Sequence, residues 1–348
     1  MTVRMIDRRI FLAGTAAACF AVRAPRVAAA DLTKVNVGMT NSQSDAPIFI
    51  GIEKGYFRDA GVELNLVAFD TAAKMIAPLG AGQLDVGGGN GSPALFNALA
   101  RGIELKIVAN KASMPPGYGY TAIVVRKALY DSGKVRTVKD LRGLKIAESA
   151  PASNLLAYTL AKYGMTFNDV QPIVLGFPEH IAALTNGSVD AISVVEPYLT
   201  KALQSGIGVR IISGDEVVPN LTVASIMYGG PFMKTQPDAA RKFMIGYVRS
   251  IRYYNDALRN GHLAGPTADD VIGIMVKYLP LKDEALYRAI TPNGVDPNGR
   301  LNLPGFERDL AFYRKEGLIE GNVTVAQAVD LSYAEAAVKQ LGPYRPRK

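Results

Sequence analysis

Four junctions in the chain combine a proline with neighbouring polar residues, a pattern that could bind an anion. The prolines are Pro47, Pro93, Pro151 and Pro197. Proline suits the first turn of a helix, because its missing N–H would have no partner there, and Ser, Asp and Asn suit the cap before it. Polar residues stand beside each proline, including Ser44, Asp45, Glu148 and Asn154. The ligand-binding candidates at these junctions are Asn41, Ser42, Gln43, Asn90, Gly91, Ser92, Ser149, Ser153 and Glu196. Free N–H groups and helix dipoles at such junctions favour an anionic group, although helix capping without a ligand explains the same residues.

Motifs typical of enzymes and cofactor sites are incomplete in this chain. Residues 89–94 fit the G-x-G-x-x-A pattern of dinucleotide-binding proteins, but the next expected strand ends near Asn110 without the acidic residue that would hold a ribose. Neither a G-x-S-x-G nucleophile elbow nor a P-loop lysine motif occurs. With two histidines (His180 and His262) and one cysteine (Cys19), the sequence predicts no metal site and no cofactor.

Strand-like and helix-like segments alternate along the chain from about Asp31. In the first series, the expected strands are 35–39, 62–67, 84–87 and 105–109, and the expected helices are 47–57, 73–79 and 92–100. A second series has strands at 145–147, 173–175, 189–194 and 209–212, and helices at 153–163, 179–184 and 198–203. Later segments are mostly helical, at 238–259, 268–278, 283–290, 306–316 and 325–341. The alternation predicts parallel sheets covered by helices on both faces.

The two series predict two α/β lobes joined by extended links at 121–125 and 223–227. The expected lobe boundaries are 31–124 plus 226–348 for the first lobe and 125–225 for the second. Residues 79–86 and 184–191 match at a constant offset of 105 positions, which supports a repeated design, although helix–Gly–strand connections are common. Because ligands bind at the carboxyl ends of strands in such sheets, the junctions of the two lobes would face one another across a cleft.

Aromatic residues near the expected cleft complete the candidate site. They are Tyr118, Tyr120, Phe177, Tyr198 and Tyr228. Aromatic walls with a few polar anchors describe a small-molecule pocket, so we expect Tyr120 and Tyr228 to flank the ligand body, with core packing as the alternative for each ring. Hydrogen bonds to the ligand would come from Asn41, Asn90, Ser92 and Ser153, and Glu196 would orient a donor group.

The N-terminus has the composition of an export signal. Arg8 and Arg9 precede an apolar run at 10–22, which is shorter than the ~20 residues that a membrane span needs, and Ala28 and Ala30 form an A-x-A cleavage pattern. We expect a twin-arginine signal over residues 1–30, cleaved near Ala30, with an uncleaved anchor or lipid modification at Cys19 as alternatives. This segment carries +4 of the formal net charge of +8, so the remaining chain is only mildly basic and a nucleic-acid partner is not expected.

The segment from Pro47 to Leu64 resembles the opening signature of the nitrate/sulfonate/taurine-type substrate-binding proteins of ABC importers. Residues 82–86, 140–146 and 196–198 also resemble that family, and the likeness recurs in order over nearly all of the chain after residue 30. The resemblance implies an α/β, two-lobe periplasmic-binding-protein fold (type II-like), with two crossover hinge strands and a ligand cleft between the lobes. It also implies a periplasmic protein that delivers its ligand to the permease and ATPase subunits of an importer.

We therefore expect a solute-binding protein rather than an enzyme, with a small organic anion as ligand. A sulfonate or carboxylate with an apolar or aromatic body fits the helix N-termini best. Related pyrimidine-synthesising enzymes rely on His and Cys in the site, and the only cysteine here falls in the expected signal. An exported enzyme and a ligand-sensing domain of a membrane receptor remain as alternatives.

Overall fold

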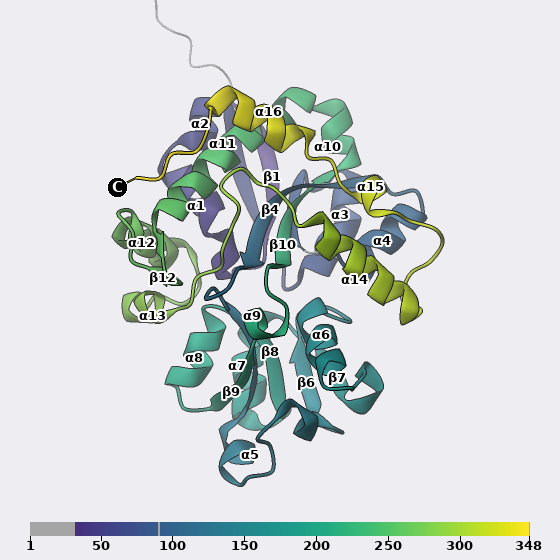
Figure 1. Ribbon diagram of the computed structural model, residues 1–348. Coiled ribbons are helices and arrows are strands. Elements are labelled where there is room, and N and C mark those ends of the chain that lie inside the picture. Colours follow the sequence, from purple (N-terminus) through teal and green to yellow (C-terminus); the bar gives the residue numbers. More distant parts are fainter. Residues whose placement is uncertain (1–31, 90, 348) are drawn as a thin grey trace, which may run out of the picture. The chain divides into compact units, whose positions relative to one another are not determined.

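The computed structural model describes residues 32–347 apart from Asn90 and contains two five-stranded sheets (Figure 1). The expected export signal at 1–30, with Cys19 and the cleavage site near Ala30, lies outside the described residues. Among the helices of the described part, none is long and apolar enough to cross a membrane.

The first sheet has the strand order β2-β1-β3-β10-β4. Its strands are β1 (Thr33–Met39), β2 (Val62–Ala68), β3 (Val86–Gly89), β4 (Leu105–Met114) and β10 (Leu221–Gly229). Strand β1 pairs in parallel with β2 and β3, whereas β10 runs antiparallel to β3 and β4.

The second sheet repeats this arrangement in the order β7-β6-β8-β5-β9. Its strands are β5 (Thr121–Arg126), β6 (Lys145–Glu148), β7 (Gln171–Val174), β8 (Ala191–Val195) and β9 (Gly208–Ser213). Strand β6 is parallel to β7 and β8, and β5 is antiparallel to β8 and β9. The two-lobe α/β architecture is therefore confirmed, and each sheet is parallel except for one antiparallel strand, β10 in the first and β5 in the second.

The exceptions are the two segments that we expected to link the lobes. Residues 121–125 lie in β5 and residues 223–227 in β10, and each is the first strand that the chain forms after crossing from one sheet to the other. The crossings themselves are the shorter stretches before these strands, at 115–120 and 214–220. A strand that enters a sheet directly from a crossing needs no covering helix before it, so it can run antiparallel to its neighbours.

Helices cover both sheets. In the first lobe they are α1 (Ala46–Glu53), α2 (Tyr56–Ala60), α3 (Ile76–Ala81), α4 (Pro93–Ala100), α10 (Gly230–Thr235), α11 (Pro237–Asp256), α12 (Ala268–Tyr278), α13 (Glu284–Ala289), α14 (Leu303–Lys315), α15 (Val325–Ala328) and α16 (Ser332–Leu341). In the second lobe they are α5 (Lys127–Asp131), α6 (Asn154–Lys162), α7 (Phe177–Asn186), α8 (Tyr198–Gln204) and α9 (Gly214–Val217). Short 3-10 turns add Gln43–Asp45, Ala72–Met75, Val138–Leu141 and Phe167–Asp169, and β11 (Leu258–Arg259) and β12 (His262–Leu263) form a small hairpin.

Two expected helices are interrupted in the structure. The helix expected at 47–57 divides into α1 and α2, because Gly55 adopts a left-handed φ of +71° between them. The helix expected at 325–341 divides into α15 and α16, because Val329 pairs with Ile107 of β4 and Asp330 donates its N–H to the Ile107 carbonyl. Of the C-terminal helices, α11 packs against α1, α2 and α16.

The internal repeat has the same structural role in both lobes. In each copy a helix ends at a left-handed glycine, Gly82 or Gly187, and an aspartate follows. The Asp85 carboxylate accepts the N–H of Asn36 at 2.7 Å, and the Asp190 carboxylate accepts the N–H of Lys145 at 3.1 Å. Each aspartate thus ties the start of its strand to the neighbouring parallel strand, which supports a common design for the two lobes.

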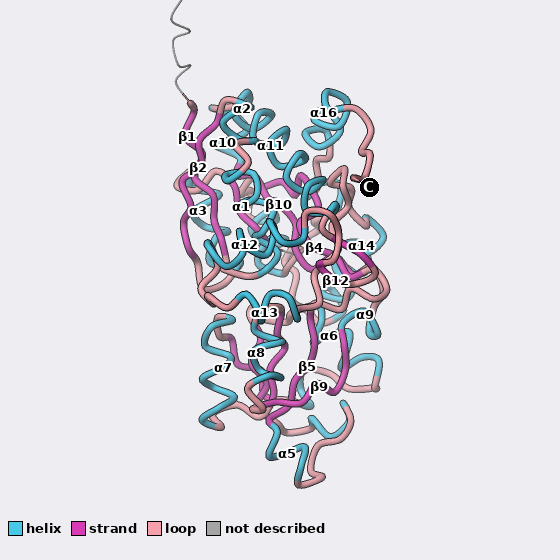
Figure 2. Tube along the Cα trace, turned by 90° about the vertical axis from the view of Figure 1, so that its left-hand side faces the viewer, coloured by secondary structure: helices cyan, strands magenta, loops and turns pink. Residues whose placement is uncertain are grey.

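The two lobes also contact each other directly beside the crossings. Helix α13 of the first lobe lies next to α8 of the second in both views (Figures 1 and 2). The N–H of Gln43 donates to the carbonyl of Glu196 at 3.2 Å, and the N–H of Thr291 donates to the Glu196 carboxylate at 3.2 Å. These bonds join segments that follow β1 and α13 in one lobe to the end of β8 in the other.

Candidate functional site

A cavity of about 90 Å³ lies between the two sheets, well above the roughly 10–15 Å³ that a single water needs. Its lining residues from the first lobe are Thr40, Ser42, Ser44, Thr71, Ala72, Gly89, Lys111, Val223 and Ala224. Those from the second lobe and the crossing into it are Tyr120, Thr121, Ser149, Ala150, Ser153, Asn154, Leu155, Phe177, Ser193, Val194 and Val195. The site is therefore large enough for a small organic molecule and is built from both lobes.

The cavity is located at the carboxyl ends of parallel strands. Ser42 follows β1, Thr71 follows β2 and Gly89 ends β3 in the first lobe, while Ser149 follows β6 and Val195 ends β8 in the second. Ligands of α/β proteins bind at such strand ends because backbone N–H groups and helix N-termini gather there. The cavity therefore lies at the strand ends where the sequence predicts a site, and ligand binding there stays a prediction.

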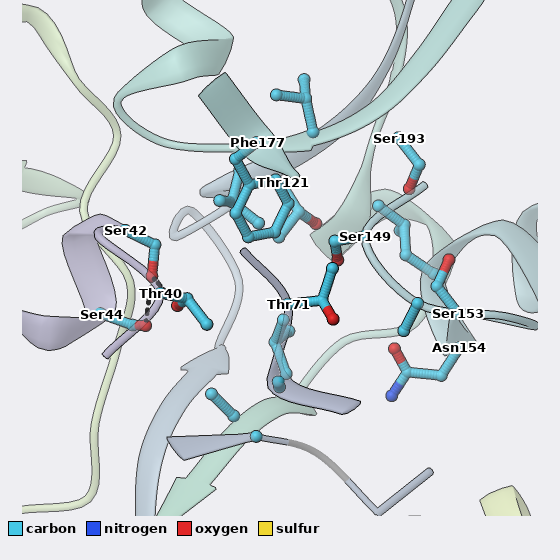
Figure 3. A pocket seen from close by; sticks show the side chains of 18 of the residues that line it. Thr40, Ser42, Ser44, Thr71, Thr121, Ser149, Ser153, Asn154, Phe177 and Ser193 are labelled. Carbon is cyan, nitrogen blue, oxygen red and sulfur yellow. Dashed lines mark hydrogen bonds between the residues drawn. The ribbon is translucent and has the colours of Figure 1, made fainter. Parts of the chain in front are cut away.

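A network of hydroxyl groups forms the first-lobe wall, as Figure 3 shows for Thr40, Ser42 and Ser44. The hydroxyls of Ser42 and Ser44 share a hydrogen bond at 2.9 Å, and those of Thr40 and Ser42 share one at 3.3 Å. The carboxylate of Asp45, just behind them, accepts the backbone N–H groups of Thr40 and Ser42, each at 3.2 Å. The aspartate thereby fixes the turn that carries these hydroxyls.

Lys111, in the middle of β4, brings a positive charge to the same wall. Its side chain is 3% exposed, and its Nζ lies 2.5 Å from Asp45 Oδ1 and donates to Ser44 Oγ at 2.9 Å. A Cβ on Gly88, in β3, would lie 3.0 Å from Lys111 Cε and 3.1 Å from Lys111 Nζ. The absence of a side chain at this position therefore makes room for the ammonium. Among the described residues that line the cavity, Lys111 is the only charged one.

The second-lobe wall offers further hydrogen-bonding groups. The hydroxyl of Ser153 is buried and has no hydrogen-bond partner in the described structure. Asn154 donates its amide to Asp309 Oδ2 at 3.4 Å and to the Thr222 carbonyl at 3.3 Å, both in the first lobe. Behind this turn, the buried carboxylate of Glu148 accepts the N–H groups of Ala152 and Ser153, and burial raises the pKa of Glu148.

Apolar side chains fill the remainder of the wall. Phe177, at the start of α7, stacks on Tyr198 with ring centroids 6.3 Å apart, and Leu155, Val195 and Val223 add aliphatic surface. Tyr120 is 2% exposed, and burial raises the pKa of its hydroxyl well above the ordinary value, so it remains neutral. The cavity thus combines polar walls with aromatic and aliphatic surface, which is typical of a site for a small organic ligand.

Four of the candidate residues line this cavity, namely Ser42, Tyr120, Ser149 and Ser153. Asn90 lies outside the described residues. The other candidates are absent from the lining: Asn41, Gln43, Gly91, Ser92, Glu196 and Tyr228.

Most of these other candidates have structural partners instead. Gln43 donates its amide to the hydroxyl of Tyr254 at 2.6 Å and accepts the N–H of Asn293 at 3.2 Å. Ser92 caps α4 by accepting the N–H of Leu95. These polar groups are satisfied within the first lobe, and Ser92 has the capping role that the sequence left open.

Gly91 and Tyr228 serve packing. A Cβ on Gly91 would lie 2.6 Å from the ring of Phe306. The ring of Tyr228 is fully buried against Phe232, Phe243 and Tyr333, and its hydroxyl donates to the Ala240 carbonyl at 2.9 Å. Asn41 takes a left-handed φ of +57° in the turn after β1.

Glu196 joins the lobes rather than lining the cavity. Its carboxylate accepts the N–H of Thr200 at 2.9 Å, the Thr200 hydroxyl at 2.8 Å and the N–H of Thr291 at 3.2 Å. Burial raises its pKa to about 7, against these hydrogen bonds, which lower it. With three donors already engaged, the carboxylate is occupied by the protein itself.

Sequence reasoning missed several lining residues, above all Lys111. A lysine within the otherwise buried strand LKIVANKASM is a detectable signal, because a charge is rarely buried without a partner. The missed hydroxyl residues are Thr40, Thr71, Thr121 and Ser193, whereas Ser44 and Asn154 stand at the proline junctions that the sequence singles out. In the described part of the chain, no group of three or more His, Cys, Asp or Glu could hold a metal ion.

Comparison with known proteins places these features in a wider context. Residues 42–257, more than half of the chain, match the family described as NMT1/THI5 like. A protein of Escherichia coli (strain K12), named for binding aliphatic sulfonates, is 32% identical over 152 residues, which cover 43% of this chain and 45% of that protein. A protein of the same name from Bacillus subtilis (strain 168) is 29% identical over 233 residues, covering 65% of this chain and 67% of that protein.

The solved structures include one with the same fold and a bound molecule. The alkanesulfonate-binding protein SsuA from Xanthomonas axonopodis pv. citri, bound to MOPS, has a TM-score of 0.68 with 20% sequence identity. The comparison covers 86% of this chain and 99% of that one. The two-lobe architecture described above is therefore the binding-protein fold.

Proposed function

The chain belongs to the NMT1/THI5-like family, and from this premise and the cavity between its lobes we propose that it is a solute-binding protein. It captures a small organic anion, a sulfonate or a carboxylate with an apolar or aromatic body. Captured ligand is delivered to the permease and ATPase subunits of an ABC importer. The names of the E. coli and B. subtilis relatives support the sulfonate class.

The composition of the cavity wall is the observation that carries the proposal. Hydroxyl groups from both lobes and the ammonium of Lys111 line it, and no described lining residue is acidic. An anion in this cavity meets hydrogen-bond donors on both sides, whereas a cation meets neutral oxygen atoms and the like charge of Lys111. The apolar surface at Phe177, Leu155 and Val223 provides a place for the body of the ligand.

Individual roles follow from the positions of the lining residues. Ser42 and Lys111 would bind the ligand from the first lobe, and Ser149 and Ser153 from the second. Tyr120 would contact the body of the ligand. Closing of the lobes by hinge motion at residues 115–120 and 214–220 would be favoured by the ligand, because only contacts made in the closed form shift the equilibrium toward it.

We also propose that the protein acts outside the cytoplasm. The twin-arginine pair, the short apolar run and the A-x-A pattern within residues 1–30 support export to the periplasm with cleavage near Ala30. Fractionation of cells that express the full chain, followed by N-terminal sequencing of the secreted form, tests this. Replacing Arg8 and Arg9 with lysine should retain the precursor in the cytoplasm if the signal is of the twin-arginine type, because that type requires the arginine pair. A general secretory signal accepts either residue, so export would then continue.

A thermal-shift screen of the purified protein tests the proposed ligand class. The panel contains alkyl and aryl sulfonates, aliphatic and aromatic carboxylates, nitrate and pyrimidines. A ligand at 100 times its Kd stabilises the folded state by about 2.7 kcal/mol, which raises the midpoint measurably. If no sulfonate or carboxylate raises the midpoint, the proposed ligand class is wrong. Chemical conversion of a bound compound, followed by mass spectrometry, would instead favour the enzyme alternative.

A further inference from the structure

The wall of the cavity contains a buried ion pair whose geometry bears on ligand choice. The side chains of Lys111 and Asp45 are 3% and 0% exposed, and their charged atoms are 2.5 Å apart. An ammonium has three N–H donors, of which one contacts Asp45 and one donates to Ser44 Oγ. The third is left for a ligand in the cavity that Lys111 lines.

Both charges are held in place by the surrounding backbone. Asp45 Oδ2 accepts the N–H groups of Thr40 and Ser42, which leaves Oδ1 for Lys111. Lys111 is held by its burial, at 3% exposure, and by its contacts with Asp45 and the Ser44 hydroxyl. The ammonium therefore cannot move far from Asp45 to meet a larger or more highly charged ligand.

The pair leaves this part of the site with no net charge. Attraction between a ligand and Lys111 grows in proportion to the ligand charge, and Asp45 opposes it. The cost of removing an ion from water grows with the square of its charge, so a divalent anion loses far more hydration than a monovalent one. Because no other described lining residue carries a positive charge, a second negative charge on the ligand would lack a partner.

We propose that Lys111 binds the anionic group of the ligand and that Asp45, as a positioning residue, restricts that group to a single negative charge. The site then accepts sulfonates and carboxylates and rejects sulfate and other divalent anions. This inference rests on the proposed function and adds the charge selectivity of the same cavity. The carboxylate of Glu148, behind Ser153 on the opposite wall, acts in the same direction whenever it is ionised.

Isothermal titration calorimetry with butane-1-sulfonate, benzoate and sulfate tests the role of Lys111. The wild-type protein should bind a monovalent probe at least 100-fold more tightly than sulfate. Lys111→Met should weaken the monovalent probe about 10- to 100-fold, the worth of a charge-assisted hydrogen bond. Lys106→Met is the matched control, because Lys106 lies on the same strand but donates to the Gln327 carbonyl away from the cavity; its affinity should equal that of the wild type.

Asp45→Asn tests the positioning role through selectivity. Removing one negative charge should raise the affinity for the sulfonate about tenfold and the affinity for sulfate about 100-fold. The effect on the logarithm doubles because the interaction energy scales with the charge of the ligand. A purely structural role would weaken both probes alike and leave their ratio unchanged. Circular dichroism verifies that the variant is folded.

A second measurement needs no variant. Butylphosphonate has the shape of butane-1-sulfonate but loses a second proton near neutral pH. We take the ratio of the affinity for butylphosphonate to the affinity for butane-1-sulfonate, both measured on the wild-type protein at the same pH. This ratio should fall at least tenfold between pH 5.5 and pH 9. The division removes any effect of pH that changes both affinities alike.

The outcomes separate the inference from the function on which it rests. If the wild-type protein binds no monovalent probe, the proposed function fails and the inference fails with it. If it binds a monovalent probe and Lys111→Met binds equally well, only the inference is overturned. A phosphonate-to-sulfonate ratio that stays constant with pH also overturns the selectivity.

Discussion

Glu196 should make the stability of the protein depend on pH in a way that one substitution removes. Burial raises the pKa of this carboxyl from the ordinary 4.5 to about 7. Because the folded-state value is the higher one, folding favours the protonated form. The resulting stabilisation is fully present below pH 4.5 and is lost as the pH rises through about 7.

The size of the effect follows from the two pKa values. A carboxyl whose pKa changes from 4.5 to about 7 on folding alters the free energy of unfolding by about 3 kcal/mol across that range. Glu196→Gln is neutral at every pH and resembles the protonated side chain, but its amide cannot accept the N–H of Thr200 and that of Thr291 together. We expect the variant to be about 1 kcal/mol less stable than the wild type at pH 4.5 and about 2 kcal/mol more stable at pH 8.

Urea unfolding at a series of pH values measures this difference. The chain contains no tryptophan, so circular dichroism or tyrosine fluorescence is the signal. Glu307→Gln, which changes an exposed glutamate of α14, is the control and should differ from the wild type by a constant amount. A Glu196→Gln difference that stays within about 0.5 kcal/mol from pH 4.5 to pH 8 would refute the reasoning, because the full linkage term is about 3 kcal/mol.

Three further predictions follow from individual contacts. Tyr158→Phe removes the hydroxyl that donates to the buried Asp309 across the lobes, so calorimetry should show about 5- to 10-fold weaker ligand binding, with Tyr130→Phe in the second lobe unchanged. Gly88→Ala places a Cβ 3.0 Å from Lys111 Cε and should lower both ligand affinity and stability, the latter by about 1–3 kcal/mol. Its control Gly273→Ala, in an exposed helical position with free space, should stabilise by about 0.5–1 kcal/mol. Tyr228→Phe loses the bond to the Ala240 carbonyl and should cost about 1 kcal/mol at unchanged ligand affinity; weaker binding by this variant would place Tyr228 in the site after all.

Local signals in the sequence suffice for the alternation of strands and helices. Pro93 marks the start of α4, and the glycines at 82 and 187 mark helix ends, because each of these residues acts through its own backbone conformation. The direction of β5 and β10 is different in kind. The direction of each of these strands is set by the point at which the chain enters the sheet from the other lobe. That depends on the arrangement of the whole fold, and the residues near the strand do not indicate it.

The candidate site shows the same division between local and long-range information. The sequence predicts that Ser42, Ser92 and Ser153 each follow a strand, and all three do. It does not tell whether the hydroxyl caps its own helix, as in Ser92, or stays without a partner beside the cavity, as in Ser153. Lys111 was overlooked because its partner, Asp45, is distant in sequence and the strand around it has an apolar pattern.

Asn154 links ligand binding to the contact between the lobes. Its side chain lines the cavity, and its amide donates to Asp309 and to the Thr222 carbonyl in the first lobe. A ligand that contacts Asn154 and Ser153 on one wall and Ser42 and Lys111 on the other touches both lobes at once. Such a ligand favours the closed form, because its contacts with the second wall exist only when the lobes are together. Under the proposed function, the interlobe bonds of Asn154 and Glu196 would belong to the same closed state that the ligand selects.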